Sequence, residues 1–114
     1  MNTYVKKPWG SYQIIEEGSI YLVKNITVKP GGQLSLQSHN NRSEHWVVVS
    51  GEAEVIIDDK KIILLSNESI YIPKKSKHRL MNNGNENLVI IEVWHGENLS
   101  EKDIERYEDI YGRL

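Results

Sequence analysis

The sequence contains no cysteine among its 114 residues. This absence excludes disulfide bonds, thiolate metal sites and cysteine nucleophiles together. A strong charge of one sign is also missing, because 14 Lys and Arg nearly balance 16 Asp and Glu and leave a formal net charge of −2. Domains that bind nucleic acid usually carry a basic surface, so we expect no nucleic-acid partner.

Long apolar runs are absent as well. No segment approaches the roughly 18–20 apolar residues of a membrane-spanning helix, and no apolar signal-peptide segment follows the lysines of the first ten residues. We therefore expect no membrane association and a cytoplasmic location. The length and the 39% hydrophobic and 26% charged composition suit one globular domain over residues 1–114.

Short segments rich in Val, Ile and Tyr alternate with turn sequences such as KPGG, DDKK and NNGNEN. This alternation predicts short strands roughly every ten residues, with no helix between them. Such a series is typical of an antiparallel sandwich or barrel. The nine predicted strands are Tyr12–Glu16, Ile20–Lys29, Leu34–Ser38, Glu44–Ser50, Ala53–Ile57, Lys61–Leu65, Ser69–Pro73, His78–Asn82 and Leu88–Trp94.

The C-terminal sequence LSEKDIERYEDIYGRL has a different pattern. Ser100 and Asp103 have the spacing of a capping box at the start of a helix. Ile104, Tyr107 and Tyr111 recur at intervals of three and four residues, which would place them on one helix face. We therefore predict a short C-terminal helix near Ser100–Tyr111, packed on an all-β fold.

Side chains that bind metal ions gather in the segment LSLQSHNNRSEHWVVVSG. Gln37 and His39 are two residues apart in one predicted strand, so they share a face. Glu44 begins the next strand after a short turn, and His78 begins another. Any one of these residues alone is more simply interpreted as a surface group. Together they would suit one divalent ion, such as Zn²⁺, Mn²⁺, Fe²⁺ or Co²⁺.

The spacing of these residues resembles the two motifs of the cupin family. The first motif fits Gly31, Gln37, His39, Glu44 and Gly51, with glutamine in place of the first histidine. The second motif fits Asn67, Pro73, Lys75, His78 and Asn82, with both of its glycines replaced. Asparagine tolerates the left-handed backbone that glycine supplies, whereas lysine does so poorly. The resemblance implies a double-stranded β-helix, the jelly-roll barrel of cupins.

Longer strings resemble the type II phosphomannose isomerases. In that family the isomerase is usually the C-terminal cupin domain of a bifunctional mannose-1-phosphate guanylyltransferase/mannose-6-phosphate isomerase. The strings KPWGSY, ITVKPG, EHWVVVSGEAEV, NESIYIP, HRL and YEDIYGR carry the resemblance from about Lys7 to Arg113. It implies that Gln37 and His39 are metal ligands, that the ion is Zn²⁺ before Mn²⁺, Co²⁺ or Fe²⁺, and that mannose 6-phosphate and fructose 6-phosphate are interconverted for polysaccharide precursors.

Two departures from that family bear on function. The family commonly has a run of histidines where this chain has Asn40 and Asn41, so no role of those histidines is assigned to the asparagines. The guanylyltransferase portion is missing, so we expect this chain alone to make no GDP-mannose and regard a separate guanylyltransferase as a candidate partner. Two alternatives stay open: a cupin isomerase or epimerase for another phosphorylated or nucleotide-linked sugar, and a non-catalytic cupin that binds sugar or metal.

The substrate would also need cations for its phosphate. Lys24 has the parity of the apolar residues in its strand, so it either extends to the rim or lies in a cavity. Arg42 stands between two predicted ligands, and Arg79 follows a third. Because alternation turns Arg79 away from His78, Arg42 is the stronger candidate. Arg106 and Arg113 lie on the predicted tail helix or just beyond it, and they would reach the barrel mouth only if that helix folds across it.

The general base is open at this stage. Glu92 is a charge inside the strand VIIEVWHG, and it either faces outward or acts as a base inside the barrel. His45 has the opposite parity to Glu44 and is expected to face away from the metal cluster. The candidates are therefore Glu92, Lys24, His45 and a metal-bound hydroxide. Since small cupins often pair through edge strands, which relieves exposed edges, we also expect a homodimer.

Overall fold

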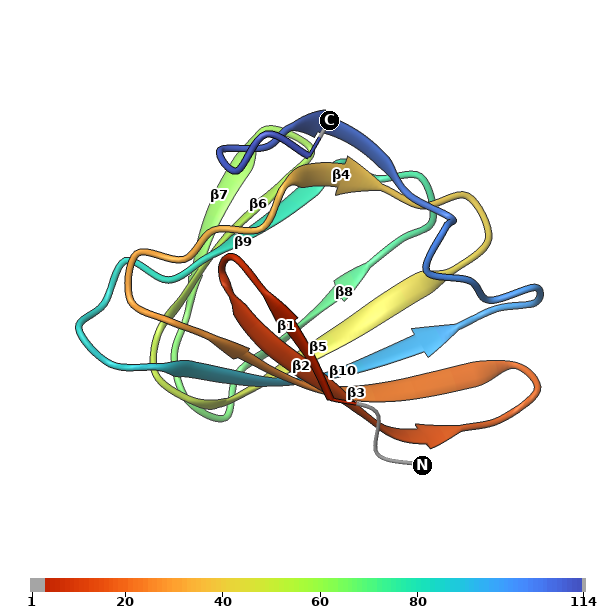
Figure 1. The fold of residues 1–114 in the computed structure, drawn as a ribbon, viewed down its shortest axis with the longest axis horizontal. Helices are drawn as coiled ribbons and strands as arrows, with labels where there is room; N and C mark the ends of the chain where they lie inside the picture. Colours follow the sequence, from red (N-terminus) through yellow and green to blue (C-terminus); the bar gives the residue numbers. More distant parts are fainter. Residues whose placement is uncertain (1–3, 114) are drawn as a thin grey trace.

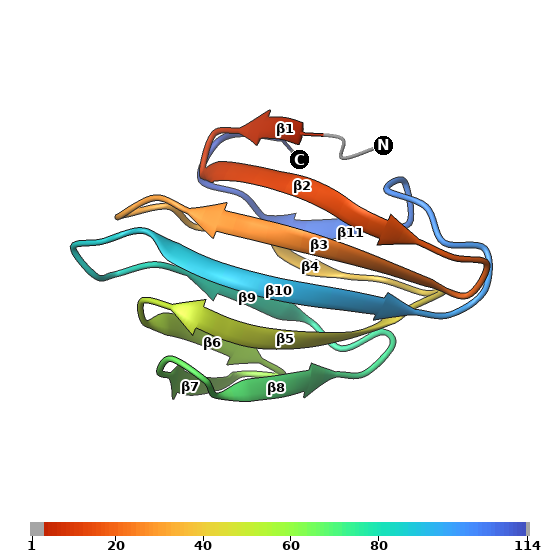
Figure 2. The same cartoon turned by 90° about the horizontal axis from the view of Figure 1, so that it is seen from below.

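Two antiparallel sheets face each other in the computed structural model, which describes residues 4–113 (Figures 1 and 2). One sheet has the order β1-β2-β3-β10-β5-β8, from Tyr4–Lys7, Gly10–Glu17, Tyr21–Val28, Leu88–His95, Ser43–Ser50 and Ser69–Ile72. The other has the order β11-β4-β9-β6-β7, from Glu105–Glu108, Leu36–Ser38, His78–Met81, Ala53–Ile57 and Lys60–Leu64. Within residues 4–113 there is no helix, and hence none that could cross a membrane.

The core lies between the two sheets and follows the two-residue period of the strands. In β3, β5 and β10 alternate residues are buried, as expected when one face of each strand is covered. Trp46, Val48, Val28 and Ile90 belong to one buried apolar cluster. At one end of these strands the inward positions are polar instead, and these positions form the site described below.

All nine predicted strands are present, and their ends lie within two residues of the predicted ones. The first strand, β1, was not predicted. Its four residues YVKK have too little apolar content to predict a strand, and pairing with β2 from Tyr4 opposite Gln13 to Lys7 opposite Gly10 defines it. Edge strands of this kind depend on a neighbour more than on their own composition.

The predicted C-terminal helix is wrong, because the structure has strand β11 there. Arg106 pairs with Gln37 and Glu108 with Leu36, so β11 covers the free edge of β4. Pairing satisfies the backbone groups of that edge, which a helix would leave exposed. Ser100 caps a turn rather than a helix, since its hydroxyl accepts from the backbone N–H of Lys102. Figure 2 shows β11 on the same side of the barrel as β1 and β2.

The turns of the second cupin motif keep a glycine-like backbone without glycine. Asn67 and Lys75 have φ of 73° and 69°, in the left-handed region where lysine is uncommon. The backbone N–H of Lys75 donates to the carbonyl of His39 at 2.8 Å. This bond holds the strained turn and links it to the loop that carries a predicted metal ligand.

Candidate active site

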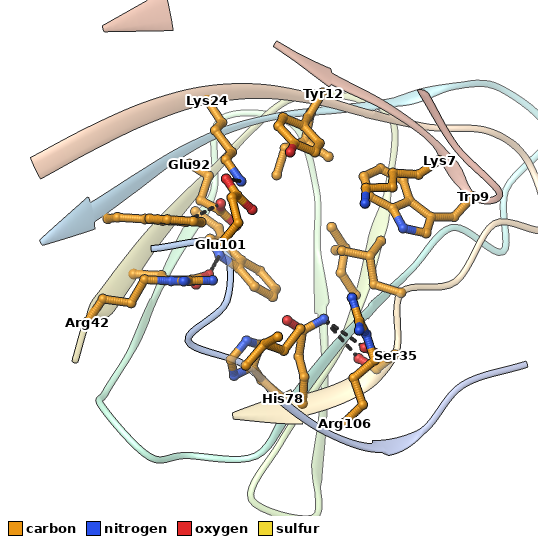
Figure 3. Close-up of a pocket in the computed structure, with 18 of the residues that line it drawn as sticks. Lys7, Trp9, Tyr12, Lys24, Ser35, Arg42, His78, Glu92, Glu101 and Arg106 are labelled. Atoms are coloured by element: carbon orange, nitrogen blue, oxygen red, sulfur yellow. Dashed lines mark hydrogen bonds and ion pairs between the residues drawn. The ribbon is translucent and has the colours of Figure 1, made fainter. Parts of the chain in front are cut away.

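A cavity of about 150 Å³ opens between the sheets at the end where the core becomes polar (Figure 3). One wall comes from inward-facing residues of β2, β3, β5 and β10, and the opposite wall from β4, β9 and β11. The register aligns these residues in rows. Lys24 and Glu92 are cross-strand partners, and Gln37 lies directly between His78 and Arg106.

Three predicted metal ligands come together in this part of the barrel. The donor atoms of His39, Glu44 and His78 lie within 4.8 Å of one another, and all three side chains are buried. His39 Nε2 is 3.3 Å from Glu44 Oε2. Gln37 lines the same cavity, and its Nε2 donates to the backbone and hydroxyl oxygens of Ser35, which leaves the amide oxygen for another partner.

Neighbouring groups orient these donors. His39 Nδ1 lies 2.7 Å from the carbonyl of Asp103, and His78 Nδ1 lies 3.0 Å from the carbonyl of Ser76. Each contact requires a proton on Nδ1 and leaves Nε2 unprotonated, with its lone pair as the donor, which is the usual arrangement of metal-binding histidines. Trp46 Nε1 donates to Glu44 Oε1 at 2.8 Å. These residues therefore fit a divalent ion in donor type and in orientation.

The protonation states of these side chains also fit a bound divalent ion. Burial lowers the pKa of His39 to about 4, more than the nearby carboxylate raises it, so the imidazole is neutral at pH 7. Burial also lowers the pKa of His78. For Glu44, burial by itself raises the pKa, but Arg42 and the two imidazoles outweigh it and lower the pKa to about 2. Neutral imidazoles beside a carboxylate are the protonation states that bind metal.

Arg42 lies beside the cluster and is already engaged. Its Nε donates to Glu44 Oε2 at 2.7 Å, and its Nη2 lies 3.1 Å from His39 Nε2. The guanidinium stacks over the Trp94 ring at 3.3 Å from its centroid. An ion bound to His39 Nε2 would take over the lone pair that Arg42 now contacts. The bond to Glu44 can persist.

Lys24 lies in the cavity and not at the rim. Its side chain is 6% exposed, and its Nζ pairs with Glu101 at 2.7 Å. The ammonium sits about 4 Å from the ring centroids of both Tyr12 and Trp94, so aromatic faces and one carboxylate surround it. Glu92 is buried beside it, and burial together with Glu44 raises the pKa of Glu92 to about 8.

Two further cations line the cavity on the side away from Arg42 (Figure 3). Lys7 and Arg106 are partly buried, and neither forms an ion pair with any residue between 4 and 113. Arg106 Nε is buried and has no hydrogen-bond partner. Every other buried side-chain nitrogen or oxygen among residues 4–113 has one. Arg113 lines the cavity too but is bound to Asp109 at 2.7 Å.

Comparison with known proteins decides the family. The sequence profile described as mannose-6-phosphate isomerase C-terminal matches residues 1–109. The chain belongs to the mannose-6-phosphate isomerase C-terminal family. Alginate biosynthesis protein AlgA of Pseudomonas aeruginosa is 57% identical over 109 residues, which is 96% of this chain and 23% of that protein. Mannose-1-phosphate guanylyltransferase ManC of Salmonella typhimurium is 51% identical over all of this chain and 24% of its own length.

The chain thus spans about a quarter of these relatives. Among solved structures, a double-stranded β-helix protein from Klebsiella pneumoniae superimposes with a TM-score of 0.74 at 22% identity, over 84% of this chain and 77% of that one. At that identity the likeness concerns the fold alone. It confirms the prediction of a cupin double-stranded β-helix for this member of the mannose-6-phosphate isomerase C-terminal family.

Asn40 and Asn41, where the resemblance led us to expect histidines, contribute backbone groups to the described contacts. The N–H groups of Asn40 and Asn41 donate to the two carboxylate oxygens of Asp103 at 2.9 and 2.8 Å. Both residues are exposed, and neither lines the cavity. The loop keeps its position through these main-chain bonds to Asp103.

The remaining predicted site residues lie apart from the cavity. Arg79 donates to the carbonyls of Leu34 and Glu108 and pairs with the Glu108 carboxylate at 3.2 Å. His45 is exposed on the outer face of β5 and packs on Tyr71. Their strand parity anticipated both positions. Glu101 and Lys7 were not proposed from sequence, because Glu101 lies on the predicted helix and nothing in KPWGSY indicates a role for Lys7. Arg106 was considered only on the condition that the tail folds across the barrel mouth, and it does line the cavity, from β11.

Proposed function

We propose that this chain is a metal-dependent mannose-6-phosphate isomerase domain, which interconverts mannose 6-phosphate and fructose 6-phosphate. The observation that carries the proposal is one cavity with a set of metal donors on one side and unpaired cations on the other. A sugar phosphate has both halves of the matching chemistry, hydroxyl and carbonyl oxygens at one end and a dianion at the other. The family and its polysaccharide-biosynthesis relatives support the same substrate class.

In this proposal Gln37, His39, Glu44 and His78 hold one divalent ion. Two imidazoles, one carboxylate and one amide oxygen make a set of four, and Zn²⁺ is the ion that most often accepts four ligands of this kind. When bound, the ion supplies a Lewis acid for the oxygen on which charge develops during isomerisation. Arg42 then orients the carboxylate of Glu44 through the hydrogen bond that its Nε donates at 2.7 Å. It also stays close enough to contact the sugar.

The phosphate of the substrate belongs, in this proposal, against Lys7 and Arg106. Lys24 and Arg42 were the candidates from sequence, but both already have carboxylate partners. Arg79 is engaged outside the cavity, so the proposed site leaves it out. Arg106 Nε is a buried donor without an acceptor, and a phosphate oxygen is the acceptor that such a donor prefers.

A coupled assay tests the function. Purified protein is loaded with Zn²⁺, Mn²⁺ or Co²⁺ and offered mannose 6-phosphate, with fructose 6-phosphate detected by a linked dehydrogenase. Turnover that disappears with a chelator and returns with the metal is the expected result. A metal-loaded protein that converts neither sugar phosphate would refute the proposal. Thermal-shift screening of other sugar phosphates and nucleotide sugars would then separate a related isomerase from a binding protein.

A homodimer is the proposed assembly. Strands β7 and β8 lie at the open edges of the two sheets, and beside them Val47, Val49 and Tyr71 are exposed on the outer face. Apolar side chains next to unpaired edges favour pairing with a second copy. Sedimentation at micromolar concentration should give twice the monomer mass of 13.2 kDa, and a monomer alone would contradict this assembly.

A further inference from the structure

The reaction proposed above needs a base that takes the proton from C2 of the open-chain sugar and returns it to C1. Three carboxylates line the cavity in the described part of the chain, those of Glu44, Glu92 and Glu101. Glu44 accepts hydrogen bonds on both oxygens from Arg42 and Trp46, and it belongs to the proposed metal ligands. It is therefore not free to accept a substrate proton.

Glu92 is poorly placed for proton transfer. It lies in the middle of β10, and only 6% of its surface is exposed. Its Oε1 accepts from Trp94 Nε1 at 2.6 Å, and Trp94 and Lys24 lie next to it. The carboxyl group thus lines the cavity but is buried among these neighbours.

Glu101 differs from both in access. It lies in the connection from β10 to β11, and its side chain is 50% exposed, although the carboxylate reaches Lys24 Nζ at 2.7 Å inside the cavity. Figure 3 shows the Glu101 side chain entering the cavity beside Lys24 and Arg42. Its position allows contact both with a bound sugar and with solvent, as a base that exchanges protons requires.

The backbone on either side of Glu101 is tied to the proposed metal ligands. The carbonyl of Ser100 accepts from Arg42 Nη1 at 3.2 Å, and the carbonyl of Asp103 contacts His39 Nδ1 at 2.7 Å. The Asp103 carboxylate also accepts two backbone N–H groups from the loop that follows His39. These contacts hold the Glu101 segment against the same loop that carries a metal ligand, so the carboxylate and the metal donors have a fixed relation.

We propose that Glu101 is the catalytic base of the isomerisation and that Lys24 positions it. The Glu101 carboxylate removes the C2 proton of the aldose, and the C–H electron pair forms the C1–C2 double bond of an enediolate with charge on O1. Protonated Glu101 then returns the proton to C1. The hydroxyl proton of O2 ends on O1, so that aldose and ketose have the same composition. This role rests on the proposed function.

The test compares Glu101→Gln with Glu97→Gln, which removes an exposed carboxylate from the same connection. Glu101→Gln should lower kcat for mannose 6-phosphate by about 10²–10⁴-fold, the usual contribution of a general base. KM and the calorimetric Kd for mannitol 6-phosphate, which has no carbonyl to isomerise, should change by less than about threefold, since the base acts mainly in the transition state. Exchange of the C2 proton with D₂O should fall in parallel with kcat. Glu97→Gln should match the wild type throughout.

Three results would overturn the assignment alone, and a fourth would refute the proposed function together with it. If kcat of Glu101→Gln stays within about threefold of the wild type, Glu101 is not the base, because a general base contributes far more than that to the rate. An affinity for mannitol 6-phosphate that falls as far as kcat makes Glu101 a binding residue. Loss of proton exchange in Glu92→Gln, with exchange retained in Glu101→Gln, transfers the role to Glu92. A wild-type protein that neither converts nor exchanges mannose 6-phosphate refutes the proposed function, and this assignment with it.

Discussion

Replacing Arg106 with methionine tests the phosphate subsite most directly. The guanidinium is partly buried, faces the cavity and has an Nε with no acceptor. Methionine removes the charge and all donors but keeps a stem of similar length that packs in the same place. No hydrogen bond to Nε is lost within the free protein, so the unfolding temperature should not fall.

The expected loss follows from the bond that the anion would make. A hydrogen bond between charged groups contributes about 1.5–3 kcal/mol, which corresponds to roughly tenfold to over a hundredfold in binding. Because the Nε donor of Arg106 is already out of water and unpaired, little desolvation offsets the gain on binding. Arg106→Met should therefore raise KM for mannose 6-phosphate by at least about tenfold.

The assay separates phosphate recognition from other effects. Calorimetry measures Kd for mannitol 6-phosphate in Arg106→Met, Lys7→Met and Arg79→Met, of which the last removes the same charge outside the cavity. Arg79 is 11% exposed, pairs with a Glu108 side chain that is 66% exposed, and donates to the carbonyls of Leu34 and Glu108. Binding is therefore compared at a temperature at which circular dichroism shows all three variants fully folded. The reasoning is refuted if Arg106→Met changes Kd by less than about threefold, or if Arg79→Met weakens binding as much, since neither fits a charge-assisted bond.

Three further outcomes are expected. His78→Ala should strip the metal without unfolding the barrel, as elemental analysis and far-UV circular dichroism would show; retained metal would contradict the ligand set. In metal-free protein, unfolded His39 and His78 bind protons near pH 6.5, whereas folded His39 has a pKa of about 4 and that of His78 is also lowered. Stability should therefore fall below pH 6.5. The folded pKa of Glu92 is raised from 4.5 to about 8, so the stability that its proton contributes is lost as the pH rises from about 4.5 to 8. The gain from the two histidines outweighs this loss up to about pH 6.5, and the loss dominates above it. Thermal unfolding should therefore peak near pH 6.5, and Glu92→Gln should lose the alkaline decline. Asn82→Ala should cost about 1–3 kcal/mol in urea unfolding, because the buried amide donates to two backbone carbonyls that would lose their donor; an unchanged midpoint would show that other groups satisfy them.

The sequence alone predicted nine of the strands and the grouping of three candidate metal donors, and both depend on short-range regularities. Alternation of side chains along β3, β5 and β10 follows from the pleat, so the order of residues by itself predicts that Lys24 faces inward and that His45 faces outward. The spacing of His39, Glu44 and His78 matches a motif in which the turns between strands have nearly constant length. Such features do not depend on contacts between distant parts of the chain.

Only the tertiary structure decided the C-terminal strand and the set of charged groups around the cavity. ERYE becomes β11 because the edge of β4 lacks a partner, while its own sequence is equally compatible with a helix. Pairing with β4 then turns Arg106 toward the cavity, and the preceding connection brings Glu101 to Lys24 across 77 positions of the chain. No local sequence pattern encodes these contacts, because they depend on how the two sheets pack together and on which sheet edge lacks a partner strand.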